Sequence, residues 1–92
     1  MSGYMRLNPD DALRWRGEAS GSMNNYATTG MWRVASQIND MPNTTCYWGS
    51  LIVFKTVNYI QQIYIGNYTT GGGRIFVRTK TDPGWSSWEK VS

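Results

Sequence analysis

The chain has 92 residues, of which 40% are hydrophobic and 16% are charged, and its formal net charge at pH 7 is +3. A chain this short forms one domain with a thin core, because it buries only about 60–65% of its unfolded surface. The composition excludes disorder, which needs low hydrophobicity and high net charge. The charge is also too small for the basic stripe of a typical nucleic-acid-binding protein. Aromatic residues at 14%, together with ten glycines, indicate an all-β protein with an exposed stacking surface.

Residues 8–17 permit two interpretations. Asn8 can cap a short helix that Pro9 would begin and Gly17 would end. The competing interpretation is a strand over Ala12–Arg16. We assign residues 1–21 to an N-terminal arm or linker and residues 22–92 to a β domain.

Beyond the arm, side chains alternate between polar and apolar as they do in strands. We expect strands at residues 31–37, 47–57, 60–65 and 74–80, followed by a last strand that contains Trp85 and Trp88. Loops are expected at residues 39–45 and 67–73, where turn-forming residues concentrate. The sequence therefore predicts an all-β fold, a small antiparallel β-sheet or sandwich-like module of four to six strands, with a short N-terminal helix or arm as an option.

The most apolar segment, Tyr47–Val57, has apolar side chains at both parities of the strand. Leu51 and Val53 would face one side, and Ile52 and Phe54 the other. Such a strand is either covered on both sides within one chain or meets another protomer with its second face.

The last hairpin is predicted to turn at Asp82-Pro83-Gly84, because proline presets φ and glycine accepts positive φ. Trp85 and Trp88 are three residues apart, so in a regular strand they would face opposite ways. We expect one of them in the core and the other on a surface or against a partner.

An enzyme is poorly supported, and we expect no catalytic residue, cofactor or metal. The chain has no histidine, which is the commonest general base and metal ligand. The adjacent Asp10 and Asp11 suit a helix start better than a cleft. Cys46 is the only cysteine, and we expect it to be a buried, inert thiol. Gly71–Gly73 lacks the lysine and serine or threonine of a phosphate loop and suits a hairpin instead.

Surface aromatic residues are the main candidates for ligand contact, because their rings stack on sugar faces while neighbouring polar groups donate and accept hydrogen bonds. For any single ring, packing in the core or between protomers is the alternative. The candidate ligand-binding residues are Trp48, Tyr64, Tyr68, Arg74, Phe76, Arg78, Trp85 and Trp88.

Three stretches carry a resemblance to a known family: Asn24–Val34 with its Thr-Thr-Gly-Met-Trp core, Gln62-Ile63-Tyr64, and the closing hairpin with Arg74–Thr79 and Trp85–Trp88. Through them the segment from 24 to 91 resembles the small β modules of bacteriophage and phage-like tail fibres, the pyocin-knob type. Met23 departs from the pattern, since a leucine or acidic residue is more usual there.

The resemblance implies a structural and host-recognition module of a tail fibre, carried on the virion and exposed to the host cell surface. It implies a homo-trimer whose partners are bacterial surface polysaccharide or another receptor and other tail proteins. Independently of the resemblance, the mild positive charge argues against nucleic-acid binding, and the lack of an apolar run of membrane-spanning length argues against membrane insertion. The family motif is largely structural, so it carries no ligand residue over to this chain.

Two other functions are open to the sequence. A carbohydrate-binding module of a lysin or other secreted protein would be a monomer with a row of exposed aromatic rings. A small single-strand nucleic-acid binder of the OB type would combine basic and aromatic strands and would bind with a steep dependence on salt.

Overall fold

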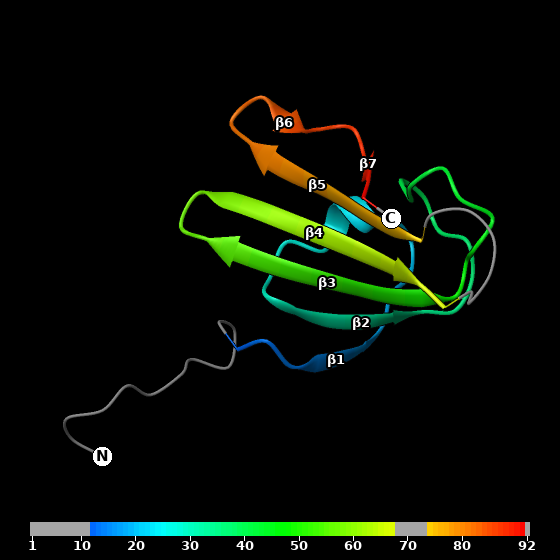
Figure 1. Cartoon of the computed structure of the whole chain (residues 1–92). Helices are drawn as coiled ribbons and strands as arrows, with labels where there is room; N and C mark the ends of the chain where they lie inside the picture. Colours follow the sequence, from blue (N-terminus) through cyan, green and yellow to red (C-terminus); the bar gives the residue numbers. More distant parts are fainter. Residues whose placement is uncertain (1–11, 68–73, 92) are drawn as a thin grey trace, which may run out of the picture.

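The computed structural model describes residues 12–67 and 74–91, and these form one twisted sheet (Figure 1). The strands of the described residues are β1 (Trp15–Glu18), β2 (Gly30–Val34), β3 (Gly49–Thr56), β4 (Tyr59–Gly66), β5 (Ile75–Thr81), β6 (Gly84–Trp85) and β7 (Glu89–Lys90), and a 3₁₀ turn, η1, covers Met23–Asn25. Six of the seven strands are hydrogen-bonded in the order β1-β2-β3-β4-β5-β6, and β7 pairs with β5 beside β6. Every strand pairing is antiparallel except that of β1 with β2. The predicted all-β class is confirmed, and two strands of only two residues bring the number above the predicted four to six.

The N-terminal helix prediction is wrong for the described part of residues 8–17. Trp15–Glu18 is a strand, parallel to β2, displaced toward the C-terminus from the alternative predicted at Ala12–Arg16. The backbone bonds from Met31 to Arg14 (2.8 Å) and from Ala19 to Arg33 (2.7 Å) tie it to the sheet. The capping residues do not produce a helix here because the edge of β2 would otherwise have unpaired backbone N–H and C=O groups. Residues 15–18 form hydrogen bonds with these groups as a strand.

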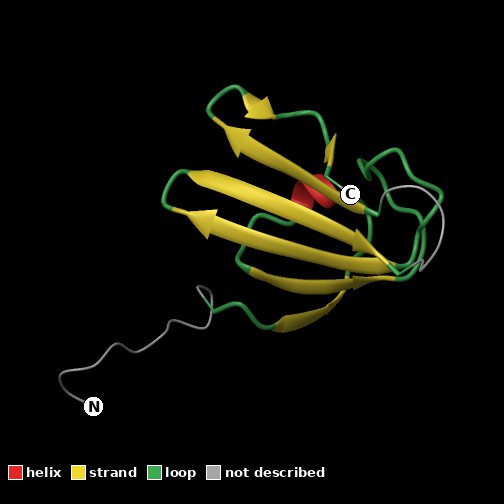
Figure 2. Ribbon diagram, in the orientation of Figure 1, coloured by secondary structure: helices red, strands yellow, loops and turns green. Residues whose placement is uncertain are grey.

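One face of the sheet carries the core. The register places Leu51 opposite Tyr64, and Tyr64 opposite Phe76, so every second residue of β3, β4 and β5 faces the same side. Figure 2 shows η1 on this side of the sheet. The buried core consists of Ala19, Met23, Val34, Leu51, Val53, Ile60, Tyr64 and Phe76. Part of the covering layer comes from the loops before and after β2 and from Trp85 and Trp88.

The opposite side of the sheet, here called the open face, is also apolar. One row across it is formed by Met31, Ile52, Ile63 and Val77, which the register aligns. In the described part of the chain, Figures 1 and 2 show no second layer over this face. Its apolar side chains are half-buried: Met31, Ile52, Phe54, Ile63, Ile65, Ile75 and Val77. The expectation of two apolar faces for the segment that became β3 is therefore correct.

The last hairpin turns at Asp82-Pro83-Gly84 as predicted, and Gly84 has a φ of 123°. The prediction that Trp85 and Trp88 face opposite ways is wrong, because both rings lie on the guanidinium of Arg78. Glu89 is four positions after Trp85 in the chain, whereas their β5 partners, Val77 and Lys80, are only three positions apart. The extra residue is a bulge, and it returns Trp88 to the face that Trp85 occupies.

Ser86 maintains the pairing where the regular strand is interrupted. Its backbone N–H donates to the carbonyl of Thr79 (2.8 Å), and its Oγ accepts from the Thr79 N–H (3.0 Å). A side-chain oxygen thus replaces one ladder acceptor, so the bulge leaves no unpaired N–H at Thr79.

Candidate saccharide-binding surface

Trp48, at the entrance to β3, is exposed and yet held in one orientation. It exposes 60% of its surface, and its indole Nε1 donates to the carbonyl oxygen of Ala35 at 2.7 Å. The carbonyl of Trp48 accepts from the N–H of Asn67 (2.8 Å) and from the thiol of Cys46 (3.3 Å). Both the ring and the backbone are therefore fixed before any ligand arrives.

A hollow of about 310 Å³ lies beside this ring, lined by Arg33, Val34, Trp48 and Asn67. Arg33 forms an exposed ion pair with Glu18 at 3.6 Å, a pair that contributes little to stability. The volume is at the lower end for small-molecule sites and suits one sugar ring. The hollow combines an apolar stacking plane with the donors of Arg33 and the amide of Asn67.

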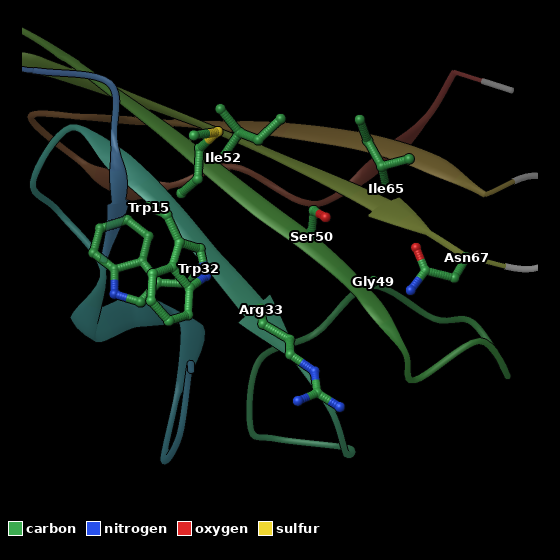
Figure 3. Close-up of a pocket in the computed structure, with 9 residues that line it drawn as sticks. Trp15, Trp32, Arg33, Gly49, Ser50, Ile52, Ile65 and Asn67 are labelled. Carbon is green, nitrogen blue, oxygen red and sulfur yellow. The ribbon is translucent and has the colours of Figure 1, made fainter. Parts of the chain in front are cut away.

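A second hollow, of about 360 Å³, opens on the open face (Figure 3). The indole rings of Trp15 and Trp32 lie at one end of it and Asn67 at the other. Met31, Ile52 and Ile65 contribute its aliphatic side chains, and no carboxylate is among its lining residues. The two hollows are neighbours, because both are lined by Arg33 and Asn67. The second hollow is more apolar and belongs to the open face.

The structure distributes the eight candidate ligand-binding residues among three places. Trp48 and Arg74 are exposed, Tyr68 lies outside the described residues, and the others line the core or its margin. Tyr64 is fully buried and donates its hydroxyl to the carbonyl of Cys46 at 2.6 Å. Phe76 is also buried, so neither it nor Tyr64 presents its ring to a ligand at the surface.

Arg78, Trp85 and Trp88 form one cluster. The guanidinium carbon lies 4.0 Å from the ring centroid of Trp85 and 4.6 Å from that of Trp88. The Nε of Arg78 donates to Oε1 of Gln62 at 2.9 Å, and Nε2 of Gln62 donates to the carbonyls of Met23 (2.7 Å) and Tyr26 (2.8 Å). The cluster thus fastens the C-terminal segment and η1 to the centre of the sheet.

Burial lowers the pKa of Arg78 to about 10, and the nearby carboxylate of Asp40 offsets part of this effect. Arg78 therefore remains charged at neutral pH. Its Nη2 is buried without a hydrogen-bond partner in the described part of the chain, and the side chain is only 6% exposed. These contacts make Arg78 a structural residue.

Cys46 is buried, as predicted, and it forms no disulfide. Within residues 12–67 and 74–91, no three His, Cys, Asp or Glu side chains lie close enough together to hold a metal ion. No helix in the described ranges has the length and hydropathy to cross a membrane.

Sequence reasoning missed two parts of this surface. Arg33 was read only as a strand residue, and Trp15 as part of the N-terminal arm. Arg33 reaches the hollow because the end of β2 lies beside Asn67 at the end of β4, across β3, an arrangement that depends on the strand order. The alternation of Arg33 with the buried Val34 was the available signal that it faces outward.

No protein-family model, curated protein or solved structure matches this chain. The functional proposal therefore depends on the chemistry of the surface and on the resemblance seen in the sequence.

Proposed function

We propose that this chain is a non-enzymatic, receptor-binding and structural module of a phage or phage-like tail fibre, which assembles as a homo-trimer and contacts bacterial surface glycans. The observation that carries the glycan part is the exposed, hydrogen-bonded ring of Trp48 beside Arg33 and Asn67. The tail-fibre setting comes from the resemblance to pyocin-knob modules. Glycan binding is also compatible with a carbohydrate-binding module of a lysin or other secreted protein.

A fixed aromatic ring suits a sugar for two reasons. Stacking on the C–H face of a pyranose needs a flat apolar plane, which Trp48 supplies. Because the ring is already held by Ala35, little conformational entropy is lost on binding. The guanidinium of Arg33 and the amide of Asn67 then supply the directional hydrogen bonds that distinguish one sugar from another.

Replacing Trp48 by alanine is expected to weaken glycan binding at least about tenfold, because the stacking plane is lost. The wild-type chain is first screened on an array of bacterial surface polysaccharides, and the best ligand is titrated by calorimetry against both proteins. Tyr59→Ala is the matched control, since Tyr59 is an exposed aromatic residue at the β3–β4 turn, outside the hollow. An array without any bound polysaccharide, or equal affinity of wild type and Trp48→Ala, would refute glycan recognition at Trp48.

The open face supports assembly with copies of the same chain. Four strands about 4.8 Å apart and rows of about six residues give it a footprint of roughly 400 Å². Apolar patches of this size on monomers are often functional. On β3, β4 and β5 the face carries Ser50, Gln61 and Thr79 but no charged side chain. The charged Arg33 of β2 and Glu89 of β7 lie at its margins, so copies that meet over the three central strands bury no charge. The footprint is below that of a standard permanent interface, so we expect association in about the micromolar range.

Ile63 lies at the centre of the open face, and its replacement by lysine is expected to weaken self-association about a hundredfold. Sedimentation equilibrium over a range of protein concentrations measures the oligomeric state of both proteins. The wild type should approach a trimer at the highest concentrations, while Ile63→Lys remains a monomer. Asn58→Lys, an exposed change in the turn between β3 and β4 and outside both strands, is the control.

A wild type that stays monomeric throughout would reject the open face as an interface between copies. If that monomer still bound glycan through Trp48, the carbohydrate-binding module would become the better assignment. Trimerisation that persists in Ile63→Lys would place the interface elsewhere on the chain.

A further inference from the structure

The loop between β2 and β3 presents a third hollow, separate from the two described above. Its apolar residues Ile38 and Met41 pack against the core, and Pro42 is buried. Its polar residues surround a hollow of about 400 Å³ whose polar lining consists of Gln37, Asn39, Asp40, Asn43, Thr44 and Tyr47. The loop is thus anchored by its apolar side chains while its amides, hydroxyls and one carboxylate line the hollow.

Hydrogen bonds to distant segments hold the loop in this shape. The N–H of Asn39 donates to the carbonyl of Gly21 (2.9 Å), and the carbonyl of Asn39 accepts from Met23 (2.9 Å). The indole Nε1 of Trp88 donates to the carbonyl of Asp40 at 2.8 Å, and Ser22 Oγ donates to the carboxylate of Asp40. The lining is therefore pre-formed, which lowers the entropic cost of binding a small polar ligand.

We infer that this hollow is a second saccharide subsite, which takes a neutral, hydroxyl-rich sugar residue of the same glycan that contacts Trp48. This inference rests on the proposed glycan-binding function. Amide groups and a carboxylate are the natural partners of sugar hydroxyls, and the exposed ring of Tyr47 offers a stacking plane.

The charge of the lining separates the two subsites. The loop hollow contains one carboxylate, Asp40, and no cationic side chain, so it disfavours an acidic sugar. The hollow beside Trp48 contains the cation Arg33 and tolerates a negatively charged one. A single carboxylate is also too few for a calcium ion, which usually takes several among its six to eight oxygen ligands.

Tyr47 and Trp48 connect the subsites. They are adjacent in the chain, and each lines one of the two hollows. Two weak contacts to one oligosaccharide reinforce one another, because the second forms at high effective concentration. A glycan of several residues should therefore bind more tightly than either of its parts.

The test is a ¹H–¹⁵N NMR titration of the full chain with the methyl glycosides of glucose, galactose and N-acetylglucosamine at up to tens of millimolar. At least one of them should shift the amide signals of Asn39, Asn43 and Thr44. Tyr47→Ala and Asn43→Ala should each weaken that binding about fivefold, while Tyr59→Ala leaves it unchanged.

The inference is overturned if no glycoside shifts the loop signals, or if shifts occur that neither Tyr47→Ala nor Asn43→Ala weakens. Loop shifts that calcium chloride alone reproduces would also overturn it. Failure of this inference is distinguishable from failure of the proposed function: Trp48→Ala would still weaken polysaccharide binding, whereas Tyr47→Ala would leave the affinity unchanged.

Discussion

Replacing Arg78 by alanine is expected to lower the free energy of unfolding by about 3 kcal/mol. The change removes the cation between Trp85 and Trp88 and leaves the buried Oε1 of Gln62 without its donor. It also opens a cavity where the aliphatic part of the side chain was packed. In the wild type, burial of the Arg78 charge with one unpaired nitrogen is itself destabilising. The net decrease in unfolding free energy is therefore smaller than the sum of the contact energies that the substitution removes.

Urea unfolding followed by circular dichroism measures this loss without depending on the two tryptophans as reporters. Lys80→Ala is the matched control: Lys80 is exposed, and its Nζ lies 6.0 Å from the ring of Trp85, so we expect a change below about 0.5 kcal/mol. Arg78→Met keeps the packing without the charge and should recover part of the stability. An Arg78→Ala protein as stable as the wild type would show that the cluster does not hold the C-terminal segment.

Replacing Gly49 by alanine is expected to cost at least about 3 kcal/mol, although alanine suits a strand better than glycine does. The new Cβ would clash with the backbone carbonyl oxygen of Ile65 and would lie 2.9 Å from the hydroxyl of Tyr64. Neither atom has room to move, since Ile65 belongs to the neighbouring β4 and Tyr64 is fully buried. The clash therefore outweighs the gain in backbone entropy.

The unfolding free energy and melting temperature of Gly49→Ala report this cost, with Ser50→Ala as the control. Ser50 is the next residue on β3 and is exposed, so its change should stay within about 0.5 kcal/mol of the wild type. A Gly49→Ala protein that unfolds at the wild-type temperature would mean that β3 and β4 separate more easily than their pairing suggests.

Gly49 also illustrates a feature that propensity cannot predict. It pairs with Gly66, and a Cβ on Gly66 would lie 2.7 Å from the thiol of Cys46. The two glycines let the chain before β3 pass close to the end of β4. From the sequence alone, both glycines only weaken a strand. The need for a residue without a Cβ follows from the close approach of the loop and the two strands in the folded structure.

The strands and their turns follow from local patterns along the chain. Alternation of apolar and polar residues predicts the strand that became β4, and Asp82-Pro83-Gly84 predicts the turn after β5. These signals are local, since the side-chain period and the φ preferences of proline and glycine act within a few residues. The all-β class and the exposed Trp48 as a candidate residue were accessible in the same way.

Non-local pairing decided the rest. A helix near Gly17 was plausible on capping residues, but pairing with β2 made that segment a strand. A one-residue bulge moved Trp88 to the side of Trp85, and burial took Tyr64 and Phe76 away from the surface. Bulges, register and burial depend on contacts between distant segments, so composition and periodicity do not contain them.

The amino-acid order thus sufficed for the kind of fold, for most strand positions and for the aromatic residues from which a binding surface could be made. The neighbours of Trp48 could be identified only from the folded sheet. Arg33 and Asn67 line the same hollow as Trp48 because the end of β2, the start of β3 and the end of β4 lie side by side. The physical reason is that local backbone preferences act along the chain, whereas a binding surface forms where packing joins residues that are far apart in sequence.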